Sequence, residues 1–151
     1  MRARSLDLPP YEGARFGVER GVVGIGEVIE PQPESPEEAA ATLARTHNEK
    51  AGRMLARFAA LPEGTFVWTR TEEDIYRLGR IMGPWRYDNS AGALRVGIPH
   101  VRETRWVGRE LHLGEIPATV AQTFDRGGRN FQRIRDEDAE RGTASPWGKH
   151  G

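Results

Sequence analysis

The sequence predicts a small α+β domain in which a strongly bent or closed antiparallel sheet forms a pseudo-barrel with flanking helices. Periodicity gives one strand, a long helical stretch, several closely spaced strands and a short late helix. The later strands leave no room for crossover helices, so antiparallel hairpins are expected. The 151 residues match one ordinary domain. We expect an irregular start over residues 1–15, a single domain over residues 1–135 and a polar tail or linker over residues 136–151.

The first half of the chain predicts a buried strand followed by helices. Residues 21–29 are a β-branched run bounded by glycine and proline, which favours a buried strand. In the helical stretch 35–61, Ser35 is the predicted N-cap and Pro36 suits the first turn. A break near Asn48 would divide this stretch into two helices. The residues that recur at helical spacing and are predicted to face the core are Leu43, His47, Ala51, Met54, Leu55 and Phe58.

The second half predicts a hairpin, a broken strand and a short helix. Residues 65–70 alternate in polarity and are joined to residues 75–83 by a polar turn, which predicts a hairpin. Residues 88–93 are expected to form a loop. Residues 94–108 predict a broken strand that lies at an edge or bends, because a proline lies inside it. Residues 116–124 predict a short helix with a proline in its first turn.

The composition excludes several functional classes. Lys+Arg and Asp+Glu balance at 22 each, so any contact with nucleic acid must come from local patches rather than bulk charge. The absence of cysteine excludes a disulfide framework, a Cys-ligated zinc and thiol catalysis. Apolar runs are too short to span a membrane, and the first residues lack the apolar centre of a signal peptide. A cytoplasmic protein with no membrane partner is expected.

The sequence contains no motif for a cofactor, a metal or catalysis. The glycines of residues 21–26 precede more strand rather than the helix that a dinucleotide site needs. The histidines lack metal-ligand spacing, and neither a GxSxG serine nor a nuclease-type carboxylate pair with a following lysine is present. We therefore expect no catalytic residue, metal or cofactor, and only the many carboxylates favour an enzyme such as a nucleotide hydrolase. His100, before a strand and beside arginines, is predicted to make a polar contact.

Aromatic residues alternate with arginines on the predicted sheet. Trp68, Trp85 and Tyr87 are candidate walls of a pocket for a flat ligand, because nucleobases stack on aromatic rings. The alternative is that they fill the core, as tryptophans on strands usually do. Alternation places Trp85 and Tyr87 on one side of the strand, with Arg86 and Asp88 on the other. The interleaved arginines that suit phosphate contacts are Arg70, Arg80, Arg86, Arg102 and Arg105.

The most basic window of the chain is residues 126–135, with four arginines, two glycines and no acid. Backbone N–H groups of a Gly-Gly pair can approach an anion. Asn130 and Gln132 carry amides that can read base edges, and Arg126 or Arg129 can hold phosphate. The alternative is a solvated loop that the acidic run directly after it neutralises.

Four motifs follow one another over residues 20–124: "VVGIGEVIE", "EGTFVWTRTEEDIYRLGRIMGPWRYD", "VGIPHVRETRWVG" and "LGEIPATVAQTF". In this order they resemble the EVE-like branch of the PUA superfamily. Two positions depart from the family pattern: Thr104 stands where an apolar residue is usual, and Trp85 where a tyrosine is more common. The resemblance implies a small pseudo-barrel with a concave site for a flipped, often modified base.

Related domains in modification-dependent restriction systems read methylated cytosine while fused to a nuclease, and the more distant YTH domains read methylated adenosine in RNA. The resemblance therefore implies a non-catalytic module that reads a flipped, methylated base in DNA or RNA, alone or with a nuclease partner or fusion. The alternative, favoured by the zero net charge, is a small-molecule or nucleotide sensor, or a protein-interaction module, on the same fold. The expected base pocket consists of Phe16, Trp68, Trp85, Tyr87, Asp88 and Asp125. The expected contacts to the nucleic-acid backbone are Arg15, Arg70, Arg126, Arg129, Asn130, Gln132 and Arg133.

Overall fold

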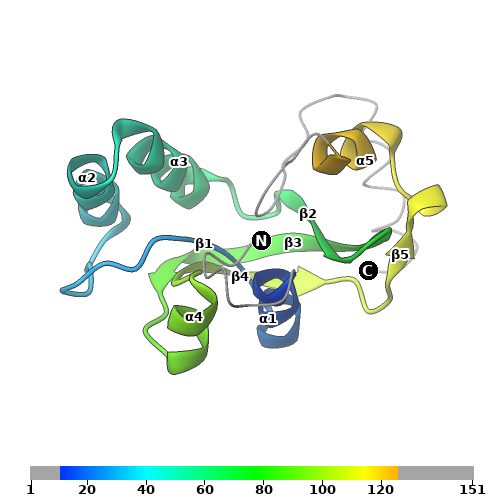
Figure 1. The fold of residues 1–151 in the computed structure, drawn as a ribbon, viewed down its shortest axis with the longest axis horizontal. Helices are drawn as coiled ribbons and strands as arrows, with labels where there is room; N and C mark the ends of the chain where they lie inside the picture. The colour runs from blue at the N-terminus through cyan, green and yellow to red at the C-terminus, as the bar shows by residue number, and fades with distance from the viewer. Residues whose placement is uncertain (1–10, 126–151) are drawn as a thin grey trace.

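The structure, a computed structural model, describes residues 11–125 and has an α+β architecture with a curled antiparallel sheet (Figure 1). Helices α1 and α4 lie on one side of the sheet, and α2, α3 and α5 on the other. The predicted class of a bent antiparallel sheet with flanking helices is thereby confirmed. The strands are β1 (Val22–Ile25), β2 (Phe66–Glu72), β3 (Ile75–Tyr87), β4 (His100–Trp106) and β5 (Leu111–His112). The helices are α1 (Glu12–Arg20), α2 (Pro36–Thr46), α3 (Glu49–Ala60), α4 (Ala91–Val96), the short 3₁₀ helix η1 (Leu113–Glu115) and α5 (Ala118–Asp125).

Strand β3 organises the sheet, whose order is β1–β4–β3–β2 with β5 also paired to β3. The start of β3 pairs with β2, which confirms the predicted hairpin, and its end pairs with β4. The ladder between β3 and β4 is interrupted between Ile81 and Trp85, where the three residues 82–84 lie opposite Glu103 alone. This bulge shifts the pairing by two residues, so Trp85 lies opposite Arg102 instead of opposite His100.

The predicted division of the long helical stretch is confirmed. Ser35 caps α2 by accepting a hydrogen bond from the Glu38 N–H, and Asn48 caps α3 by accepting one from the Ala51 N–H. The prediction that His47 faces the core is wrong. Its side chain is 39% exposed at the corner between the two helices, with Nε2 3.6 Å from Glu27 Oε2. Met54 is also exposed.

Three predicted elements differ from the structure. The first strand ends at Ile25 rather than continuing to Ile29. Part of the expected irregular start is helix α1, which ends at Gly21 with a positive φ of 73°. The expected loop 88–93 and the first part of the expected strand contain helix α4, which Ser90 caps. Buried residues, among them Ala14 in α1 and Ala93 in α4, pack against the core. This packing overrides the weak helix propensity of the glycines in both helices.

The hydrophobic core consists of two clusters. The first lies beneath α2 and α3 and includes Leu43, Leu55 and Phe58 from those helices, with Ile81 from β3. The second, which includes Trp68, lies at the other end of the sheet and packs against α5. Within residues 11–125, no helix is long and apolar enough to cross a membrane.

A buried arginine joins the bulge of β3 to the end of α3. Arg102 is 3% exposed, and its Nε donates to the Gly83 carbonyl at 2.8 Å. Its Nη1 donates to the carbonyls of Phe58 at 3.1 Å and Leu61 at 2.5 Å. Burial lowers the pKa of the guanidinium, which remains charged beside the negative end of the helix dipole. Arg102 is therefore a structural residue, and its grouping with arginines suited to phosphate is wrong.

We expect the substitution Arg102→Met to lower the free energy of unfolding by about 3 kcal/mol, because it leaves buried carbonyls without their charged donor. Urea unfolding followed by circular dichroism measures the loss. The control is Arg105→Met, an exposed position on the same strand that should cost less than about 0.5 kcal/mol. Equal losses in the two variants would contradict a bridging role for Arg102.

Candidate functional site

Three rings meet where β3 ends and β4 begins. Tyr87 lies opposite His100 in the ladder. Trp85, two residues earlier on the same strand, lies opposite Arg102 because of the bulge. The Trp85 and His100 rings stack with centroids 6.1 Å apart, and the Tyr87 ring meets His100 edge-on at 5.3 Å. Trp85 and Tyr87 are half-buried and pack against the first core cluster, whereas His100 is fully buried.

The contacts of His100 determine its tautomer. The Trp85 indole N–H can only donate, and it lies 3.2 Å from His100 Nδ1, so Nδ1 carries the lone pair. The proton is then on Nε2, which donates to the Glu27 carbonyl at 2.7 Å. Burial lowers the pKa of His100 to about 4, against the smaller opposing effect of the Glu27 carbonyl. Both ring nitrogens are therefore satisfied by the neutral imidazole.

The segment between β1 and α2, residues 26–34, is called the strap here and runs out from the sheet toward α2 (Figure 1). The Tyr87 hydroxyl holds the strap by accepting from the Ile29 N–H at 3.1 Å and donating to the Ile29 carbonyl at 3.2 Å. Farther along, Gln32 Oε1 accepts from Asn89 Nδ2 at 2.9 Å. Glu27, Ile29 and Gln32 thus each fix the strap to β3, β4 or the turn after β3.

An open groove of about 540 Å³ lies between the strap and the end of β3, and it is called the strap groove here. The end of β3 supplies one wall, which contains two aromatic residues and is called the aromatic wall here, and the strap supplies the other, called the polar wall. Aromatic residues beside hydrogen-bonding groups suit a flat ligand with hydrogen-bonding edges. The formal charges of the lining, one arginine and one glutamate, cancel. The lining residues are Gln32, Pro33, Glu34, Trp85, Arg86 and Tyr87.

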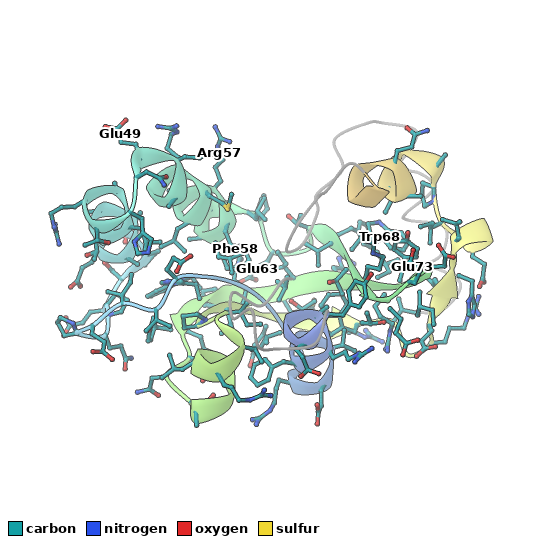
Figure 2. All side chains as sticks on the ribbon, viewed as in Figure 1. Glu49, Arg57, Phe58, Glu63, Trp68 and Glu73 are labelled. Carbon is teal, nitrogen blue, oxygen red and sulfur yellow. The ribbon has the colours of Figure 1, made fainter. Side chains whose placement is uncertain are left out.

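The structure brings together two of the predicted pocket residues, Trp85 and Tyr87, and separates others from them. Trp68 is 1% exposed in the second core cluster and lies beneath α5 (Figure 2). It is far along the sheet from Phe58, which belongs to the cluster that Trp85 and Tyr87 pack against. Phe16 is buried in the first core cluster with the Arg20 guanidinium over its ring. Neither Trp68 nor Phe16 lines the strap groove.

The other predicted site residues within the described range have local partners. Arg15 Nε donates to the Thr71 carbonyl at 3.1 Å and links α1 to β2, and the Arg70 guanidinium lies over the Tyr11 ring. Asp88 Oδ1 accepts from the Ser90 N–H at 2.9 Å and shapes the turn into α4.

The remaining predictions fall outside what the structure describes. Asp125 ends α5, but its side chain is not among the described ones. The residues beyond the described range are Arg126, Arg129, Asn130, Gln132 and Arg133.

Sequence reasoning did not find the polar wall of the strap groove. Gln32, Pro33 and Glu34 lie in a stretch that the sequence marks only as the end of a strand. The prolines of this stretch alternate with polar residues and indicate a rigid connection, but they do not indicate which strand the connection crosses. The predicted polar contact of His100 is confirmed, by way of Trp85 and Glu27.

Comparison with protein-family models, curated proteins and solved structures finds no match for this chain. Among the residues that the structure describes, no group of three or more histidine, aspartate or glutamate side chains could hold a metal ion. The chemistry available at the strap groove is therefore stacking on rings, hydrogen bonding to an amide and a carboxylate, and charge pairing with one guanidinium.

The contacts of His100 predict a specific loss of stability in acid. Between pH 6.5 and pH 4 the unfolded chain binds a proton at His100 and the folded chain does not, so stability falls as the pH falls. The free energy of unfolding should drop by about 3 kcal/mol over this window. Urea unfolding at a series of pH values measures it.

The matched variant is His100→Gln, whose amide can accept from the Trp85 indole and donate to the Glu27 carbonyl but does not titrate. The difference between the two pH profiles isolates the imidazole from the carboxylates that also titrate in acid. Parallel profiles would show that His100 takes up its proton equally in the folded and unfolded chains.

Proposed function

We propose that this chain is a non-catalytic nucleic-acid-binding module that reads a flipped, modified base in the strap groove. The observation that carries the proposal is the composition of the groove: two half-buried aromatic residues, Trp85 and Tyr87, line a space of about 540 Å³ together with the amide residue Gln32 and the acid Glu34. Stacking on aromatic rings supplies about 1–3 kcal/mol per base and tolerates any base. The polar wall supplies what stacking lacks, contacts to the base edge.

The polar groups of the groove complement a nucleobase edge. The carbonyl oxygen of Gln32 is occupied by Asn89, so its NH₂ group is the part of that amide suited to an acceptor on a ligand. The Glu34 carboxylate accepts hydrogen bonds only, as an exocyclic amine requires. Arg86, exposed on the groove wall, suits the phosphate of the same nucleotide.

The fold is consistent with this function. A curled antiparallel sheet with flanking helices is compatible with the EVE-like, PUA-like pseudo-barrel, which we propose as the family on the strength of the ordered motifs. The groove lies between the segment that follows the first of those motifs and the end of the second, because residues 32–34 and 85–87 line it.

We expect Trp85→Ala to weaken binding of a methylated oligonucleotide about tenfold or more, because the stacking surface is lost. Fluorescence anisotropy with labelled oligonucleotides, single-stranded and duplex, carrying one 5-methylcytosine, one N6-methyladenine or no modification, measures the affinities. Circular dichroism checks that the variant is folded. If all oligonucleotides bind the unchanged protein equally weakly, base reading is lost as a function.

A second pair of variants tests the phosphate contact. Arg86→Ala should weaken binding equally for all oligonucleotides and reduce the slope of log affinity against log salt by about 0.9, the value for one phosphate. The matched control is Arg57→Ala, an arginine that points away from the sheet on the exposed face of α3 (Figure 2). Equal effects of the two substitutions would show that Arg86 does not contact the phosphate.

The second candidate function is a sensor of a free nucleotide, and the cancelling charges of the groove favour it, since a single nucleotide needs no extended basic surface. Thermal shift with free nucleosides and nucleotides separates the two candidates. A shift of the melting temperature by a free nucleotide, together with no oligonucleotide binding, would establish the sensor and exclude the reader.

A further inference from the structure

The two walls of the strap groove come from distant parts of the sequence, and the buried side chain of His100 is one of the links between them. His100 accepts from Trp85 on the aromatic wall and donates to Glu27 on the strap, which carries the polar wall. His100 does not itself line the groove. Its role toward a ligand is therefore positional: it sets where the indole lies relative to the strap.

The link through His100 depends on the protonation state of its imidazole. A protonated ring carries N–H groups on both nitrogens, so Nδ1 could no longer accept from the Trp85 indole, and two donors would face each other across 3.2 Å. The contact with the Glu27 carbonyl survives, because that nitrogen donates in both states. One proton therefore breaks the link to the aromatic wall and leaves the link to the strap.

The charged groups on the described elements around His100 have contacts of their own. The Glu27 carboxylate on the strap pairs with His47 at the corner of α2 and α3, 3.6 Å away. On β4 itself, Arg102 lies two residues along and is cationic. The turn after β3 contributes Asp88, whose carboxylate accepts from the Ser90 N–H.

Trp85 and Tyr87, the rings that contact His100 from β3, bring no carboxylate to it. The surroundings of His100 thus favour the neutral imidazole, in agreement with its lowered pKa.

We propose that His100 is a positioning residue and a proton-sensitive switch of the strap groove: the neutral imidazole holds Trp85 in place beside the strap, and one proton frees Trp85 and displaces the aromatic wall. The inference rests on the proposed function only for the identity of the ligand. Binding and protonation then oppose each other, so a ligand that needs Trp85 in place lowers the affinity of His100 for a proton by the factor by which the proton weakens binding.

The displacement is limited to Trp85, because a second link between β3 and the strap does not depend on the proton. The Tyr87 hydroxyl holds the Ile29 backbone through two hydrogen bonds that involve no titrating nitrogen. The side chain of Ile29 also stays in the first core cluster. Acid should therefore free the indole of Trp85 while the strap remains attached at Ile29.

The first test uses the free protein and needs no ligand. In ¹H–¹⁵N spectra recorded from pH 7 downward, the Trp85 indole N–H signal should move with the same midpoint as the His100 ring, while the Ile29 amide stays protected from hydrogen exchange. An indole signal that does not move while the ring titrates would overturn the proposal. So would a loss of the far-ultraviolet circular dichroism signal at the same midpoint.

A substitution of Trp85 tests the same hydrogen bond through its effect on the pKa of His100. Trp85→Phe keeps a ring but removes the donor that occupies Nδ1, so the pKa of His100 should rise toward its ordinary value of 6.5. The matched control is Trp106→Phe, because the Trp106 indole N–H donates to the Val22 carbonyl and the pKa of His100 should not change. An unchanged pKa of His100 in Trp85→Phe overturns the proposal, even if His100 variants fail to fold.

The last test adds the ligand, a labelled oligonucleotide with one methylated base. Affinity of the unchanged protein should fall, for each pH unit below the His100 midpoint, by up to tenfold more than affinity of His100→Gln, whose remaining fall reports the other groups that titrate in acid. The same pH dependence in both proteins would overturn the switch. If no oligonucleotide binds at any pH, the proposed function is lost, and the spectra of the free protein still decide whether His100 positions Trp85.

Discussion

The position of the aromatic wall depends on one buried cation. Arg102 donates to the Gly83 carbonyl in the bulge of β3 and to the carbonyls of Phe58 and Leu61 at the end of α3. A buried guanidinium is costly unless its donors are satisfied, and a helix C-terminus supplies both acceptors and a negative potential. The arrangement of the bulge and the end of α3 is therefore coupled: moving either one leaves a buried charge without its acceptors.

The bulge in turn determines which side chains meet. Without it, Trp85 would lie opposite His100, and Tyr87 would lie beyond the start of β4. With it, Tyr87 lies opposite His100, and its hydroxyl reaches the backbone of Ile29. Since the shift is by an even number of residues, every side chain keeps its face of the sheet. One irregularity of the ladder thus allows both rings to contact the same imidazole without exposing the core.

The sequence predicts this fold best where local signals are strong. The cap Ser35, the break near Asn48 and the polar turn between β2 and β3 were found because their chemistry acts over a few residues. Helix α1 was missed because Gly13 and Gly17 oppose a helix locally and only burial explains them.

The candidate site was predicted in part for the same reason. Alternation correctly grouped Trp85 with Tyr87, but it could not show that Trp68 faces a different core cluster. It also could not place the strap, since Ile29 and Tyr87 are 58 residues apart. The energetics of the proposed base reading explain why fixed walls would matter for it. Stacking contributes about 1–3 kcal/mol, whereas flipping a base out of a duplex costs a few kcal/mol and one buried methyl adds only about 0.8 kcal/mol. Because these contributions are of similar size and opposite sign, a small displacement of the Trp85 ring would decide whether the proposed ligand binds.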